Sequence, residues 1–160
     1  MSGRNAVTVE IKGLDALQKK MEELPRDVAK KGIRQSLRAG GKIISAAMAA
    51  MAPSDTGFLA KHFGIRTKMY SGELAGSVFV GPEGRIDYPE SSGYREKVTS
   101  SGKKYKVGRI GVAAVARYLE FGTSKMAKHP FMTQAFEVHK ENALNAIIKK
   151  LRDYLEKAVK

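Results

Sequence analysis

The triplet Asp55-Thr56-Gly57 is the stretch whose residue types come nearest to catalytic chemistry. Aspartic proteases carry their catalytic carboxylate in such a triplet, and two of these carboxylates must share one proton. The triplet occurs once here, so only a dimeric protease could be built from it. In those enzymes the triplet follows an apolar strand, whereas here it follows a predicted helix. Turn formation explains the same residue types, and we favour that interpretation.

In this interpretation each residue around the triplet has a structural role. Pro53 ends the preceding helix, Thr56 and Gly57 shape the turn, and Leu59 begins the apolar face of a sheet.

No other residue set in the sequence makes an active site. The three histidines, His62, His129 and His139, have no metal-site spacing, and there is no cysteine to complete one. We predict an N-cap role for His129, before Pro130. The chain has neither a Gly-x-Ser-x-Gly nucleophile motif nor a complete phosphate-binding loop. We therefore predict a protein that is not an enzyme and has no cofactor or bound metal.

Positive charge is the unusual property of the composition. The chain has 29 Lys and Arg against 16 Asp and Glu, a net charge of +13 that is spread evenly along the sequence. Between residues 94 and 109, aromatic and basic side chains alternate in a way that would suit nucleic acid. The candidate contact residues are Tyr94, Arg95, Lys97, Lys103, Lys104, Lys106 and Arg109. A flexible, soluble loop explains this composition as well, and we favour it over a dedicated DNA site.

The 160 residues predict a single domain, 1–160, in which 83–104 form a long basic loop. Hydrophobic residues make up 42% of the chain, as in ordinary globular proteins, and no apolar run is long enough to cross a membrane. No secretory signal is visible at the start, and the absence of cysteine fits assembly in a reducing cytoplasm.

Hydrophobic periodicity predicts the elements of the first half. Alternation over 7–11 predicts a strand, and spacings of three and four predict helices over 14–24 and 25–51. Gly40-Gly41 lies inside the second helix, where it indicates either close packing against another element or a bend. Alternation over 63–69 and 74–80 predicts a β-hairpin.

The second half ends in a long helix. A strand is possible over 105–112, a short helix is predicted over 113–121, and a helix of nearly thirty residues begins at Pro130. Together these elements predict an α+β fold. A small, mostly antiparallel sheet is packed by the long helix of the N-terminal half and by the long C-terminal helix, and a long basic loop is inserted.

Two motifs, in order, resemble those of the tailed-bacteriophage neck or tail-completion family. The first is Ala52-Pro53-x-x-Thr56-Gly57 after a long helix. The second is Glu120-Phe121-Gly122-Thr123, followed by Pro130-Phe131 and a terminal helix. The resemblance extends from about residue 11 to the end, although the basic segment 83–109 is longer than the family pattern suggests.

The resemblance implies a structural protein that joins the tail to the head connector as a ring around the DNA channel. Its partners would be other copies of itself, six being the expected number, together with head connector or stopper proteins and tail terminator or tail-tube proteins. DNA passing through the channel would be a further partner, and no membrane is involved. The implied location is the head–tail junction of a virion assembled in the bacterial cytoplasm.

The residue types of the second motif predict local roles as well. Phe121 and Phe131 would be core anchors, Gly122 would set a sharp turn, and Thr123 would bind the backbone in that turn. The interface candidates are Tyr118, Glu120, Phe121, Gly122, Thr123, Pro130 and Phe131. Stabilisation of the fold explains this motif at least as well as direct partner contact. A DNA-binding module that uses 94–109 is the alternative function, and the dimeric protease is a third.

Overall fold

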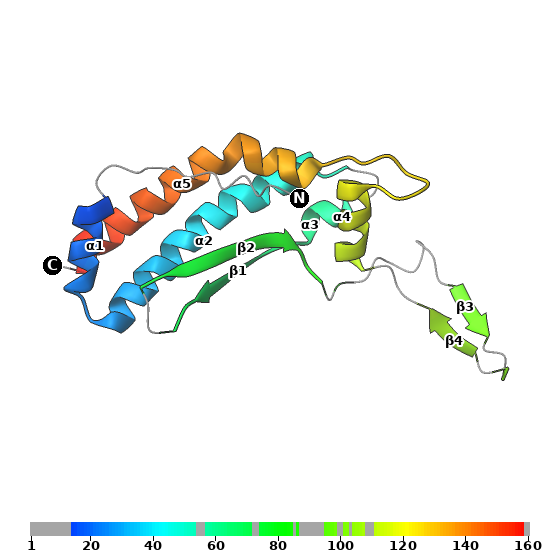
Figure 1. Ribbon diagram of the computed structural model, residues 1–160, viewed down its shortest axis with the longest axis horizontal. Coiled ribbons are helices and arrows are strands. Elements are labelled where there is room, and N and C mark those ends of the chain that lie inside the picture. Colours follow the sequence, from blue (N-terminus) through cyan, green and yellow to red (C-terminus); the bar gives the residue numbers. More distant parts are fainter. Residues whose placement is uncertain are drawn as a thin grey trace, which may run out of the picture.

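The computed structural model describes residues 14–53, 57–71, 74–84, 86, 95–98, 101–102, 104–107 and 111–158. The fold is α+β, as predicted: two long helices lie side by side and a small antiparallel sheet packs along one of them (Figure 1). Some predictions concern positions outside the described residues, namely the strand over 7–11 and residues Asp55, Thr56, Tyr94, Lys103 and Arg109.

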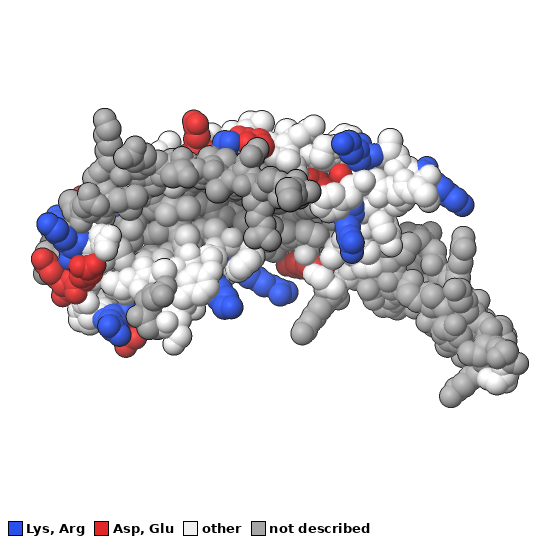
Figure 2. Space-filling view, in the orientation of Figure 1, with Lys and Arg blue, Asp and Glu red and all other residues white. Residues whose placement is uncertain are grey.

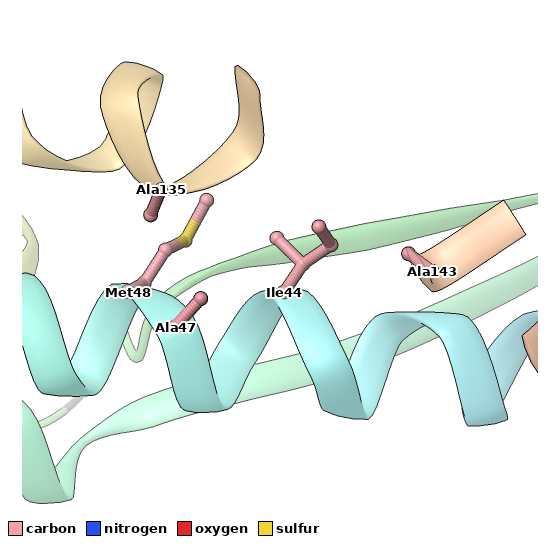
Figure 3. Packing of buried hydrophobic residues seen from close by; sticks show 5 residues of the cluster. All are labelled: Ile44, Ala47, Met48, Ala135 and Ala143. Atoms are coloured by element: carbon pink, nitrogen blue, oxygen red, sulfur yellow. The ribbon is translucent and has the colours of Figure 1, made fainter. Parts of the chain in front are cut away.

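The two long helices pack antiparallel to each other. Helix α2 (Arg26–Met51) and helix α5 (Phe131–Ala158) have the most extensive contact in the described structure. At one end of the pair the Tyr154 hydroxyl donates to the Val28 carbonyl at 3.0 Å. At the other end Met48 packs with Ala135 in a cluster that also contains Ile44, Ala47 and Ala143 (Figure 3).

The glycine pair inside α2 marks close packing, and the helix continues through it without a break. A Cβ atom on Gly40 would lie 2.5 Å from Ile147 Cγ1 on α5. A Cβ atom on Gly41 would lie 2.8 Å from Val78 Cγ2 on the sheet. Successive helical residues point about 100° apart, so the two glycines face different elements. Gly40 therefore allows α5 to approach α2 closely, and Gly41 allows the sheet to do so.

The predicted hairpin is confirmed. Strands β1 (Phe63–Met69) and β2 (Gly76–Pro82) pair antiparallel, with Phe63 opposite Pro82 and Met69 opposite Gly76. Val80 and Phe63 pack against the buried cluster between α2 and α5. The sheet therefore covers one side of α2 while α5 covers another.

Short helices close the two ends of this body. Helix α1 (Leu14–Glu22) buries Met21 against Ala29 and Leu155. At the opposite end lie α3 (Phe58–Lys61) and α4 (Val112–Phe121) (Figure 1). The second buried cluster there contains Ala52, Leu59, Val112, Ala116 and Phe131.

The predicted place of Leu59 at the start of the sheet is wrong. The residue lies in α3, 2% exposed, and the sheet begins only at Phe63. Gly57 explains the difference, because its left-handed backbone (φ 65°) opens a helical turn between α2 and the first strand.

The prediction of an irregular loop through 83–104 is wrong in part. Strands β3 (Arg95–Val98) and β4 (Lys104–Val107) pair antiparallel, with Lys97 opposite Tyr105. A strand as far as residue 112 is also wrong, because Val112 already begins α4. Backbone pairing of two strands does not require an alternating apolar face, so hydrophobic alternation gives little signal for it.

Charge is dispersed over the face of the described residues that Figure 2 shows. On the face in Figure 2, Lys and Arg side chains are separated from one another and mixed with acids. Within the described residues, no helix is long and apolar enough to span a bilayer.

Candidate interaction site

Glu120 holds the second sequence motif together from inside the protein. Its side chain is 4% exposed although it carries a carboxyl group. The backbone N–H of Met132 donates to Glu120 Oε2 at 2.9 Å, and that of Thr133 donates to Oε1 at 3.0 Å. The Thr133 hydroxyl donates to Oε1 as well. These N–H groups belong to the first turn of α5, where helical backbone donors have no partner within the helix. Glu120 is therefore an N-terminal cap supplied by another helix.

The spacing of residues in α4 indicates that Glu120 is buried, although it does not indicate which groups the carboxyl binds. Val112, Ala116 and Glu120 are buried and follow one another at intervals of four, so they share one face of α4. That face points into the cluster around Phe131. The predicted cap is His129, but its contribution to the start of α5 is its backbone carbonyl, which accepts from Phe131 at 2.8 Å.

Gly122 and Thr123 form the sharp turn that the sequence predicts. Gly122 has φ 76°, and its N–H donates to the Tyr118 carbonyl at 2.8 Å. A Cβ atom at Gly122 would lie 2.8 Å from the Met126 carbonyl oxygen. Thr123 Oγ1 accepts from the Lys125 N–H at 3.2 Å, while Thr123 and Met126 exchange backbone hydrogen bonds. The turn is thus built from backbone contacts that other residues at 122 would disturb.

Phe131 is a core anchor, as predicted, but Phe121 is not. The Phe131 side chain is completely buried and its ring meets Phe63 edge-on, with the centroids 6.1 Å apart. Phe121 is 73% exposed. It follows the buried Glu120 by one residue, and a rotation of about 100° takes it from the buried face to the solvent. Pro130, half-buried, leads directly into α5.

Exposed apolar side chains gather along the end of α4 and the turn. We call Tyr118, Phe121 and Met126 the corner surface, and each of the three is more than one-third exposed. Tyr118 and Phe121 are three residues apart on one helix, so their side chains are neighbours. Between these residues in sequence, Glu120 is hydrogen-bonded to the start of α5 and Gly122 lies in the tight turn, so both ends of this stretch of backbone are held in place.

The first sequence motif acts as a structural connection where it is described. Helix α2 ends at Met51, and Ala52 has extended backbone (φ −62°, ψ 131°). The following Pro53 restricts Ala52 to this conformation and thus ends the helix. The geometry of Asp55 and Thr56 lies outside the described residues.

Four of the basic candidates lie in the β3–β4 hairpin. Arg95 and Lys97 belong to β3, while Lys104 and Lys106 belong to β4. The register places Glu96 opposite Lys106. In Figure 1 this hairpin lies beyond α4, away from the body formed by the long helices and β1–β2.

The side chains that could bind a metal are dispersed in the described part of the chain. No group of three or more His, Cys, Asp and Glu side chains among them could hold a metal ion. His62 Nδ1 lies 3.8 Å from Glu83 Oε2, and its ring packs against Phe58. That arrangement is a partly exposed surface contact.

Most of the chain, including part of this site, matches a known protein family. Residues 15–122 match the family model described as "Bacteriophage HK97-gp10, putative tail-component". The match covers α1 to α4 and includes both Gly57 and the Glu120–Gly122 corner. No significant match to a curated protein or to a solved structure was found.

Proposed function

Because the chain belongs to the HK97 gp10-like family of bacteriophage tail components, we propose that it is a structural subunit that completes the tail and joins it to the head connector. In this proposal the subunits form a closed ring, of six copies, around the channel through which DNA leaves the head. The neighbours of the ring are connector or stopper proteins on one side and terminator or tail-tube proteins on the other. The protein acts by assembly within the virion and catalyses no reaction.

The observation that supports this proposal most strongly is the corner surface. Phe121 is 73% exposed and lies beside the exposed Tyr118 at the end of α4, the helix that Glu120 joins to the start of α5. Aromatic side chains on a rigid support are the usual anchors of protein interfaces. We place the contact between neighbouring ring subunits at Tyr118, Phe121 and Met126.

A cyclic ring requires two different surfaces on each subunit, because its contacts are head-to-tail. The corner surface supplies one of them. The β3–β4 hairpin, which lies away from the body, is suited to reach a neighbour or the DNA in the channel. Binding of DNA by this hairpin is the alternative function, supported by the basic residues on both of its strands.

The decisive experiment measures mass in solution by light scattering, over a range of concentrations, for the wild type and Phe121→Glu. We expect a ring or a concentration-dependent assembly for the wild type and a monomer for the variant. Val138→Glu is the matched control, because Val138 is 64% exposed but lies on α5. A Phe121→Glu protein that assembles like the wild type would exclude the corner surface as the contact. A wild type that remains monomeric even with connector proteins, but binds duplex DNA with submicromolar affinity, would favour the alternative.

A further inference from the structure

An apolar groove runs over the middle of α2, between β2 and α5. Its volume is about 900 Å³. Large apolar side chains from all three elements line it: Ile44, Met48, Val78, Val80, Phe136 and Ile147. Gly40 and Gly41 form part of its floor. Phe79 and Phe136 at its sides remain 58% and 47% exposed.

The strand that borders this groove has a free edge within the described residues. β1 and β2 form a two-stranded sheet, so β2 has a strand partner on one side only. An unpaired edge presents N–H and C=O groups that accept another strand. The groove thus offers an apolar floor together with a line of backbone hydrogen-bonding groups.

We propose that residues 7–11 of the same chain occupy this groove as a third strand, antiparallel to β2. These residues lie outside the described part of the chain, but their sequence and their reach suit the groove. Val7, Val9 and Ile11 alternate with Thr8 and Glu10, so an extended segment has one apolar and one polar face. The apolar face matches the floor, and the polar face meets the solvent.

The position of α1 indicates how far residues 7–11 can reach along β2 and in which direction they would run. Leu74, two residues before β2, packs against the cluster that joins α1 to α2 and α5. In the proposed arrangement residues 7–11 would end toward the beginning of β2, and the two strands would then be antiparallel. Extended chain covers roughly 3.3 Å per residue. About ten residues before Leu14 can span about 30 Å, which exceeds the length of the seven-residue β2.

Engineered disulfides test the proposal, and the chain has no native cysteine to interfere. Residues on the outer face of β2, such as Phe79, would lie opposite either Thr8 or Glu10, depending on register. We expect one of the double variants Thr8→Cys/Phe79→Cys and Glu10→Cys/Phe79→Cys to form an intrachain disulfide under mild oxidation. The control Val9→Cys/Phe79→Cys should form none, because its two side chains would be on opposite faces. An interchain disulfide would overturn the proposal in favour of a second copy in the groove. Absence of a disulfide in both test pairs would also overturn it.

Amide hydrogen exchange gives a second measurement on the full-length chain. Val9→Asp would place a charge on the groove floor, whereas Thr8→Asp would place it in the solvent. We expect exchange of the β2 amides that point away from β1 to become at least about tenfold faster in Val9→Asp and to stay unchanged in Thr8→Asp. Equal exchange rates in both variants and the wild type would contradict the proposal.

Discussion

Glu120 supplies to α5 the acceptors that a short polar residue at an N-cap normally supplies. Here the carboxyl group comes from α4 and takes the place of a serine or aspartate next to α5. The cap therefore accepts hydrogen bonds from the N–H groups of α5 and also joins α4 to α5. These hydrogen bonds explain how a side chain with a carboxyl group can be buried. In the Glu120–Thr123 motif, Glu120 is thus a structural residue, and its neighbour Phe121 is exposed.

Removing this carboxylate tests its contribution to stability. We expect Glu120→Ala to lower the free energy of unfolding by about 2–4 kcal/mol, because two helix N–H groups and a hydroxyl are deprived of their acceptor. Urea denaturation followed by circular dichroism measures this change. Glu137→Ala is the matched control: Glu137 is exposed on α5, and its removal should cost less than about 0.5 kcal/mol. Equal effects of the two substitutions would contradict the capping role.

Gly122 gives a second test at this scale. We expect Gly122→Ala to destabilise the protein by about 1–3 kcal/mol, since its φ is 76° and its Cβ would meet a carbonyl oxygen at 2.8 Å. Gly84→Ala should have little effect, because no heavy atom lies within 4 Å of a Cβ there. Thermal unfolding of both variants measures the difference. A Gly122→Ala protein as stable as the wild type would show that the turn tolerates another conformation.

At the scale of elements, the glycine pair determines how near α5 and the sheet approach α2. Alanine has the higher helix propensity and would favour the isolated helix by about 1 kcal/mol. Even so, we expect Gly40→Ala to destabilise the protein by about 1–3 kcal/mol. Its Cβ would lie 2.5 Å from Ile147 Cγ1 and 2.9 Å from the Ala143 carbonyl oxygen, so α5 must shift.

The double variant Gly40→Ala/Ile147→Val provides the check for this interpretation. If the clash with Ile147 causes the destabilisation, removing the Cδ1 methyl, 2.7 Å from the new Cβ, should recover part of the stability. The free energy of unfolding of the four proteins of this cycle gives the coupling. Strict additivity would indicate that the two positions do not meet.

The sequence predicts the long elements well because their signal is local. Apolar spacing locates α2, α5 and the β1–β2 hairpin to within a few residues. From the sequence, Gly40-Gly41 is compatible with close packing and with a bend in the helix. Only the elements that pack against the two glycines, α5 and the sheet, decide between these alternatives. No local pattern marks Glu120 as a cap, because the helix that it caps begins eleven residues later. Hydrophobicity alone assigns Phe121 to the core, although its position relative to Val112 and Ala116 places it outside.

At the scale of the whole molecule, the β3–β4 hairpin is separate from the body in Figure 1 and has no extensive contact with another described element. We therefore expect its charges to matter for binding and not for folding. Replacement of Arg95, Lys97, Lys104 and Lys106 by Gln should leave the melting temperature within about 2 °C of the wild type.

The same variant separates the two candidate functions. If the hairpin binds duplex DNA, the salt dependence of log K should become shallower by about 0.9 for each phosphate that the variant no longer neutralises. Fluorescence anisotropy at several salt concentrations measures this slope. An unchanged slope with unchanged assembly would show that the hairpin serves neither function.

The α2–α5 contact has a consequence for the order in which the chain folds during synthesis. The partners on the sheet side of α2 are complete once residue 82 has left the ribosome, but its other partner is made from the last thirty residues. Until then, the face containing Gly40, Ala47 and Met48 has no cover from α5. Nascent chains stopped before Phe131 should therefore aggregate or recruit chaperones, whereas full-length chains should not.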